Sequence, residues 1–258
     1  MSKKLRMILI FCMAVSIFTM VGCSSTTTET ETSTDSDTEE ATNGELKTLK
    51  IGTQPSLIDM VQSVEESLED EGYDLELVPF NDVIQPNVAL FEGEIDCTIH
   101  QHKPYLDAYN NDNGTDLYFA APLVSGFQGL YSRKYDTLES IPENAKIGTY
   151  EDLTNQHRSL VFAESLGFIE LGEPTADGMY TILDITENPK NIEFVTLDRG
   201  GLVQGLEDLD ACFLNANLLA QAGLDPESYI AKEEQESFSE YATGVVVRDE
   251  DKDAEWID

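Results

Sequence analysis

The chain has 258 residues, of which 50 are acidic and 15 are basic, so its formal net charge at pH 7 is −35. A surface this negative repels phosphate groups and argues against nucleic acid as a partner. Beyond residue 23 only two cysteines occur, Cys97 and Cys212, and each lies in an apolar run. This placement favours two small buried residues over a disulfide pair.

The first 22 residues have the pattern of a secretory signal peptide. Basic residues between positions 3 and 6 precede an apolar run over residues 7–21, which is shorter than the ~20 residues needed to span a bilayer. The run ends in Met20-Val21-Gly22-Cys23, which resembles a bacterial lipobox, where the cysteine becomes the lipidated first residue of the mature protein. We predict that residues 1–22 are removed and that Cys23 is lipidated; the alternative is an ordinary signal followed by a chance cysteine.

Residues 23–45 consist mainly of serine, threonine, glutamate and aspartate, with almost no apolar side chains. Such a segment cannot bury enough surface to offset the chain entropy lost on folding, so we expect a disordered tether. A lipid at the start of this tether anchors the folded part to the extracytoplasmic face of the cell membrane.

Strand-like and helical patterns alternate from residue 46 onward. Residues 49–53 and 73–78 read as strands on either side of an amphipathic helix over residues 58–69. A second helix over residues 85–90 leads to a third strand over residues 95–102. This βαβαβ order predicts parallel strands with right-handed crossovers.

A second series of elements follows an apolar segment over residues 118–131. Its predicted strands are 146–149, 192–197 and 210–214, and its predicted helices are 158–166, which ends at Gly167, and 205–209. A last strand over 241–247 can return to the first series. We therefore predict an α/β chain with two lobes joined by two crossing strands around a hinged cleft. The first lobe is expected over residues 46–124, the second over 125–240, and the return to the first over 241–258.

Polar side chains gather where the strand over residues 95–102 ends. His100 and His102 lie near its tip and Tyr105 follows, because Pro104 lacks an amide hydrogen and biases the preceding residue away from helix. Open α/β sheets bind their ligands at the C-terminal ends of strands. This tip is a candidate ligand site, and the alternative is a strand-end histidine that caps a loop.

The segment Gln101-His102-Lys103-Pro104-Tyr105-Leu106-Asp107 resembles a motif of the NlpA/MetQ family of lipoproteins, the methionine-binding subunits of ABC importers. The resemblance extends from residue 49 to about residue 254 through further landmarks in the same order and spacing. These landmarks are Phe80-Asn81-Asp82 with Pro86-Asn87, Thr154-Asn155 with Arg158-Ser159-Leu160, Glu187-Asn188-Pro189-Lys190-Asn191, Asn215, and Arg248-Asp249.

The resemblance implies the two-lobed fold of periplasmic binding proteins, in agreement with the order of the predicted elements. It also implies a lipid-anchored subunit that captures a free amino acid, methionine or a more polar relative, without catalysis and without a cofactor. The implied partners are that amino acid, the permease and ATPase subunits of an ABC importer, and the membrane. Family members continue through a further C-terminal helix, so we expect a fragment or a truncated copy.

In this family an arginine at the position of Arg158 holds the ligand carboxylate. We expect Arg158 near the start of its helix, where its planar fork and the unpaired helix amides both favour an anion. The alternative is an ion pair at the surface. Thr154 and Asn155 are expected to cap this helix rather than contact the ligand. Replacing Arg158 with alanine is expected to abolish binding and leave the fold intact.

The resemblance implies further ligand contacts. Asn215 is expected to accept a hydrogen bond from the ligand ammonium group, and the alternative role is a loop cap. His102 and Tyr105 are expected to flank the ligand side chain. The remaining expected contacts are His100, Phe80 and Thr243.

Several positions depart from the family pattern toward a more polar pocket. Val83 and His100 stand where aromatic residues are common, the crossing segment near Ser125 lacks another aromatic, and Thr243 replaces an asparagine. A thioether gains about 0.3–1.5 kcal/mol from an aromatic contact. We therefore expect the ligand preference to shift from methionine toward a more polar side chain.

Two other functions are weaker alternatives. A metal-binding lipoprotein would use His100 and His102, although zinc sites usually have three or four ligands. An enzyme would use Cys97 or a serine together with His102, but no nucleophile-elbow glycine pattern surrounds any serine.

The charge leads to a testable hypothesis. Loss of three basic residues with the signal peptide leaves 12 basic and 50 acidic residues, a formal net charge of −38. Self-repulsion at this charge destabilises the compact state unless salt screens it, so we expect a salt-adapted source. The melting temperature should rise from dilute buffer to molar salt, and a flat melting temperature would contradict the hypothesis.

Overall fold

The computed structural model describes residues 46–234 and 240–257. The predicted signal peptide, the lipidation site Cys23 and the tether over residues 23–45 lie outside the described residues, as does part of the segment that precedes the last strand. Among the described residues, none of the helices is long and apolar enough to cross a membrane.

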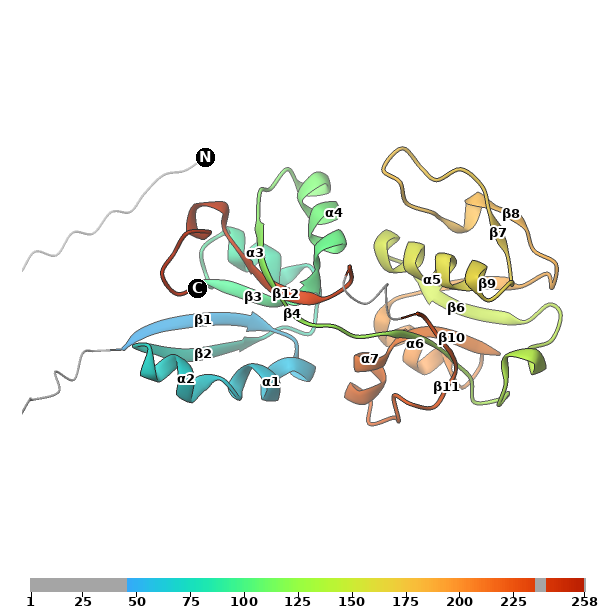
Figure 1. The fold of residues 1–258 in the computed structure, drawn as a ribbon, viewed down its shortest axis with the longest axis horizontal. Helices are drawn as coiled ribbons and strands as arrows, with labels where there is room; N and C mark the ends of the chain where they lie inside the picture. Colours follow the sequence, from blue (N-terminus) through green and yellow to red (C-terminus); the bar gives the residue numbers. More distant parts are fainter. Residues whose placement is uncertain (1–45, 235–239, 258) are drawn as a thin grey trace, which may run out of the picture. The chain divides into compact units, whose positions relative to one another are not determined.

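The first sheet contains five strands in the order β2-β1-β3-β12-β4 (Figure 1). Strand β1 pairs in parallel with β2 and β3, as the predicted βαβαβ order requires, whereas β12 runs antiparallel between β3 and β4. Every residue of β3 is buried, because this strand is central in the sheet. The strands are β1 Lys47–Thr53, β2 Tyr73–Pro79, β3 Cys97–His102, β4 Tyr118–Val124 and β12 Thr243–Val247.

Helices cover both faces of this sheet. Residues of η1 and α1 pack in one core cluster with β1 and β3, and residues of α3 and α4 pack in another with the opposite side chains of the sheet. Figure 1 shows α1 and α2 on one side of the strands and α3 and α4 on the other. These elements are η1 Pro55–Leu57, α1 Ile58–Gln62, α2 Glu65–Asp70, α3 Gln85–Phe91 and α4 Lys103–Asn113.

The prediction of one continuous helix over residues 58–69 is wrong. The structure has two short helices, α1 and α2, separated at Ser63 and Val64. The Ser63 hydroxyl donates a hydrogen bond to the carbonyl of Met60 at 2.6 Å. Serine side chains compete with the backbone in this way, which disfavours a continuous helix.

The second sheet also has five strands, in the order β11-β5-β10-β6-β9. Strand β6 pairs in parallel with β9 and β10, and β5 runs antiparallel to β10 and β11. A two-stranded ribbon of β7 and β8 lies apart from this sheet. The strands are β5 Gln128–Tyr131, β6 Lys146–Tyr150, β7 Glu170–Leu171, β8 Ile185–Glu187, β9 Glu193–Leu197, β10 Ala211–Asn215 and β11 Tyr229–Lys232.

Helix α5 packs in one core cluster of the second lobe, and α6 and α7 pack in the other. The helices are α5 Leu153–Ser165, α6 Arg199–Gly205 and α7 Ala216–Gln221, with short helices η2 Leu138–Ser140 and η3 Ile182–Asp184. A last short helix, η5 Asp249–Asp251, follows β12 of the first sheet. Burial raises the pKa of the Cys97 and Cys212 thiols to about 12. Both cysteines are free and buried, which confirms the prediction made from their apolar surroundings.

The prediction of a helix over residues 205–209 is wrong. Helix α6 ends where that helix was expected to start, at Gly205. The helix begins earlier because the Asp198 carboxylate accepts a hydrogen bond from the amide of Gly201 and caps it, while Leu202 is fully buried. This cap and the buried leucine outweigh the low helix propensity of the two glycines that follow Arg199.

The fold is the expected α/β arrangement of two lobes, each built on its own sheet. The chain leaves the first sheet after β4 and enters the second at β5, and it returns from β11 to β12. Strand β12 therefore belongs to the first sheet although it follows the whole second lobe. The boundaries assigned to the lobes from the sequence stay predictions.

Candidate functional site

A cavity of about 760 Å³ lies between the two lobes. Its lining includes residues from β3 and β12 of the first sheet and from α5, α6 and α7 of the second lobe. Of the residues expected to contact a ligand, those that line it are Arg158, Asn215, His102, Tyr105, Thr243 and His100. Phe80 does not line this cavity; it lines a neighbouring one of about 330 Å³ and packs against the first lobe's core.

The strand tip has the expected geometry, and a helix follows it directly. Strand β3 ends at His102 and α4 begins at Lys103, with Pro104 in its first turn. The Nδ1 atom of His102 accepts a hydrogen bond from the amide of Tyr105 at 3.1 Å and so caps α4. Thr243 of β12 is paired with His102 across the sheet. Nδ1 thus caps a helix, not the loop of the alternative, while Nε2 lies 3.4 Å from Asn155 Oδ1 of the second lobe.

The His100 imidazole is held inside the first lobe. Its Nδ1 lies 2.7 Å from the Thr98 hydroxyl, and its Nε2 lies 3.1 Å from the carbonyl of Val83. The carbonyl can only accept, so Nε2 carries the proton and Nδ1 accepts from the hydroxyl. Burial lowers the pKa of His100 from 6.5 to about 4 and, together with the nearby Arg158 charge, lowers the pKa of His102 to about 3. Both rings are therefore neutral at pH 7.

The burial of His100 predicts a pH-dependent stability. Its folded-state pKa lies below 6.5, so between pH 6.5 and about 4 the unfolded chain binds a proton that the folded chain does not. This imidazole therefore lowers the free energy of unfolding as the pH falls through that window. When the pH falls from 7 to 5, we expect the free energy of unfolding to drop by about 2 kcal/mol less in His100→Gln than in the parent.

Urea unfolding of the parent and of His100→Gln at both pH values measures this difference. Comparing the two proteins cancels the titration of the many carboxylates, which they share. Equal pH dependence in the two proteins would contradict the assignment of a buried neutral ring.

The imidazole contacts give the metal hypothesis no support. Three of the four ring nitrogens of His100 and His102 are within 3.1 Å of a protein partner, and the fourth faces Asn155. Within residues 46–234 and 240–257, no group of three or more histidine, cysteine, aspartate or glutamate side chains is placed to hold a metal ion.

Arg158 does not lie near the start of its helix, so that expectation is wrong. Helix α5 begins at Leu153, and Arg158 lies in its second turn. Asp152 caps the helix, because its carboxylate accepts from the Asn155 amide at 2.9 Å. The expected caps, Thr154 and Asn155, instead donate side-chain hydrogen bonds to this carboxylate. Because the helix starts at Leu153, Thr154 and Asn155 lie inside it and Asp152 takes the capping position.

The Arg158 guanidinium is buried and paired with Glu233. Its Nε donates to Glu233 Oε2 at 3.0 Å, and its Nη2 donates to Glu233 Oε1 and to the Gly126 carbonyl, the latter at 2.9 Å. The guanidinium carbon lies 4.4 Å from the centre of the Tyr241 ring. Arg158 Nη1 makes no hydrogen bond to any described residue.

This ion pair corrects two expectations. The alternative for Arg158 was a surface ion pair, whereas both Arg158 and Glu233 are about 95% buried. Removing one member of a buried pair leaves an uncompensated charge, which costs about 3–5 kcal/mol. The pair therefore argues against the expectation that Arg158 can be replaced without cost to the fold.

Sequence reasoning missed Glu233, because it has the same local pattern as many other acidic residues of the chain.

Amide side chains connect the two sides of the cavity. Asn155 Oδ1 lies 3.4 Å from His102 Nε2 and 3.4 Å from Asn215 Nδ2. Asn215 Oδ1 accepts from Gln128 Nε2 at 3.3 Å, and the backbone N–H of Asn215 donates to the Tyr150 hydroxyl at 2.9 Å. Asn215 thus precedes α7 without a side-chain cap, contrary to the alternative of a loop cap. Asn155, expected to be structural, lines the cavity.

Arg199 is a cavity residue that sequence reasoning missed. It is the first residue of α6 and lines both the main cavity and the neighbouring one. Its Nη2 donates to Gln54 Oε1 of the first lobe at 3.4 Å. The erroneous helix prediction over residues 205–209 placed Arg199 in a loop, so nothing in the pattern indicated this position.

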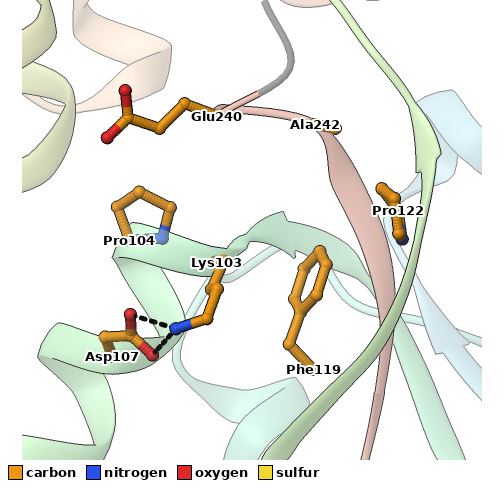
Figure 2. A pocket seen from close by; sticks show the side chains of 7 residues that line it. All are labelled: Lys103, Pro104, Asp107, Phe119, Pro122, Glu240 and Ala242. Carbon is orange, nitrogen blue, oxygen red and sulfur yellow. Dashed lines mark hydrogen bonds and ion pairs between the residues drawn. The ribbon is translucent and has the colours of Figure 1, made fainter.

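A smaller hollow of about 300 Å³ lies elsewhere on the first lobe (Figure 2). Figure 2 shows that the Lys103 ammonium contacts both carboxylate oxygens of Asp107, at 2.8 and 2.6 Å. The two charges satisfy each other, and none of the residues expected to bind a ligand lines this hollow. The interlobe cavity is therefore the candidate site.

Comparison with known proteins gives consistent matches. The family model described as NlpA lipoprotein matches residues 49–258. The D-methionine-binding lipoprotein MetQ of Yersinia pestis is 32% identical over 263 residues, an alignment that covers 99% of this chain and 89% of the relative.

Solved structures match the fold as well. The crystal structure of a putative lipoprotein from Ruminococcus gnavus has a TM-score of 0.77 and 30% identity, covering 82% of this chain and 88% of the other. A nutrient binding protein from Burkholderia cenocepacia, solved bound to methionine, has a TM-score of 0.75 and 35% identity, covering 81% of this chain and 88% of the other.

Proposed function

Because the chain belongs to the NlpA lipoprotein family, we propose that it is the lipid-anchored substrate-binding subunit of an ABC importer. It captures a free amino acid in the interlobe cavity and delivers it to a permease driven by an ATPase. The protein performs no catalysis. The names of its relatives support methionine or a chemical relative of methionine as the ligand class.

One observation carries this proposal: the cavity collects groups suited to a zwitterion from both lobes. Arg158 Nη1 is available for a carboxylate, and the guanidinium is already positioned by Glu233 and the Gly126 carbonyl. The side-chain oxygen Oδ1 of Asn215 has a second lone pair for an ammonium group, and Thr243 lines the same cavity. Binding groups that are held in place before the ligand arrives lose less entropy on binding.

The walls of the cavity support a ligand with a polar side chain. His100, Val83 and Thr243 all line it, and these are the positions where the sequence departs from the aromatic or amide residues of the family. His102 and Tyr105 line the cavity as well, together with the rings of Phe127, Tyr150 and Tyr241. We propose that methionine binds less tightly than a more polar amino acid, since Val83 offers its thioether no ring and the Thr243 hydroxyl favours a polar group.

Calorimetric titration of the full chain in detergent, with L- and D-amino acids and with a chelator present, tests the function. We expect saturable binding of one amino acid per chain that is unchanged by the chelator. Failure of every amino acid to bind would overturn the proposal, and binding that requires zinc would favour the metal alternative.

The lipid anchor has its own prediction. Expression of the parent in a bacterium should yield a membrane-associated protein whose N-terminal peptide carries lipid at Cys23. Cys23→Ser should remove the lipid and release the protein from the membrane fraction. Mass spectrometry of the N-terminal peptide and fractionation measure both effects, and a Cys23→Ser variant that remains lipidated would contradict the assignment.

A further inference from the structure

Arg199 differs from the other arginines of the described chain in its partners. Arg133 pairs with Glu207, Arg158 with Glu233, and Arg248 with Asp251. Arg199, by contrast, has no carboxylate within 4.0 Å among the described residues, although the chain contains 50 acidic residues. Its guanidinium donates to a neutral amide, that of Gln54, at the long distance of 3.4 Å.

The charge of Arg199 acts on the ligand cavity. Arg199 lines that cavity and the adjoining one of about 330 Å³, so its side chain lies where the two meet. Its positive charge adds to the lowering of the pKa of His100 and His102, for which burial is the main cause. Since Glu233 neutralises Arg158 and both imidazoles are neutral, Arg199 is the one cavity cation of the described chain without a counter-charge.

The acidic residues of the cavity wall are Asp82, Glu151, Asp152 and Asp198, and three of them are engaged elsewhere. Asp82 accepts from the amides of Ile84 and Gln85, and Asp152 and Asp198 cap α5 and α6. Each of these carboxylates is thus held by backbone amides on its own element. None of them pairs with Arg199, which leaves the guanidinium donors for a ligand.

We propose that Arg199 is a specificity-determining residue that binds an oxyanion at the side-chain end of the ligand. The inference rests on the proposed function and narrows the substrate class to α-amino acids with an acidic side chain, such as a dicarboxylic amino acid. Arg158 receives the α-carboxylate in the second lobe, and Arg199 receives the second anion. A guanidinium fork suits a carboxylate because two N–H groups bond two oxygens in one plane.

The test compares glutamate with glutamine, which has the same shape and lacks the charge. Titration of the full chain in detergent should show tighter binding of glutamate than of glutamine, by about tenfold or more. Arg199→Met should remove this preference, so that glutamate and glutamine bind with similar affinity. Arg133→Met, which removes the same charge outside the cavity, should keep the preference.

A further variant separates ligand recognition from lobe contact. Gln54→Leu removes the described partner of Arg199 and retains its charge, so the glutamate preference should persist. Equal weakening of all ligands by Arg199→Met and Gln54→Leu would show that the contact only joins the lobes, and would overturn the inference. If methionine binds and Arg199→Met leaves the glutamate-to-glutamine ratio unchanged, this inference fails and the proposed function stands. If no amino acid binds, both fail.

Discussion

Replacing Arg158 with methionine will abolish amino-acid binding and will also destabilise the fold. The replacement removes the donor expected to meet the ligand carboxylate, a loss of about 100-fold or more in affinity for a buried charged hydrogen bond. It also leaves Glu233 buried without its partner, at a cost of about 3–5 kcal/mol in the free energy of unfolding. Calorimetric titration measures the first effect and denaturant unfolding the second.

A double variant separates these two effects. The double variant Arg158→Met/Glu233→Gln lacks the buried negative charge. Its new side chain at position 233 can still accept the hydrogen bond that Glu233 Oε1 receives from the backbone N–H of Gln128. We expect the double variant to recover most of the lost stability, because replacing both members of a buried pair is often neutral. Binding should remain absent. Binding that returns with stability would show that Arg158 acts only through the fold.

Replacing Gly244 with alanine will destabilise the first lobe strongly. Gly244 lies in β12, between β3 and β4, next to Thr243 of the cavity. A Cβ atom at this position would lie 2.2 Å from the carbonyl oxygen of Ala121 and 2.4 Å from the ring of Phe119. The carbonyl is backbone of the neighbouring strand and cannot move without disturbing the pairing. We expect a loss of about 3 kcal/mol, at the upper end for an overpacked core.

Gly126 provides the matched control for this effect. A Cβ at Gly126 meets no atom within 4 Å, and its φ angle is outside the left-handed region. Gly126→Ala should therefore change the free energy of unfolding by no more than about 0.5 kcal/mol. Denaturant unfolding of both variants measures the difference, and equal losses in the two would show that backbone entropy rather than steric overlap governs Gly244.

The candidate site was only partly predictable from the sequence. His100, His102 and Tyr105 could be placed together because the end of a strand at a proline is a local feature. The family resemblance added Arg158, Asn215 and Thr243, which do line the cavity. Phe80 does not line this cavity but a neighbouring one, and its sequence landmark carries no information on the direction of the ring.

The errors in the starts of α5 and α6 have a common cause. Asp152 and Asp198 each begin a helix at a position where propensity alone favours a later start. The capping carboxylate bonds an amide three residues ahead, at Asn155 and Gly201 respectively. In a chain with 50 acidic residues, aspartates are so frequent that a single one is a poor signal for a helix start.

By itself the sequence determined the alternation of strands and helices, the two-lobed α/β class, the family and the strand tip with its two imidazoles. These features depend on neighbours within a few residues or on motifs in a set order, which a linear reading preserves. Only the tertiary structure decided the partners of the cavity cations. Glu233 lies 75 residues from Arg158, and Gln54 lies 145 residues from Arg199. Which side chain meets which cation depends on how the two sheets place β11, α5 and α6 around one cavity, and no local pattern carries that information.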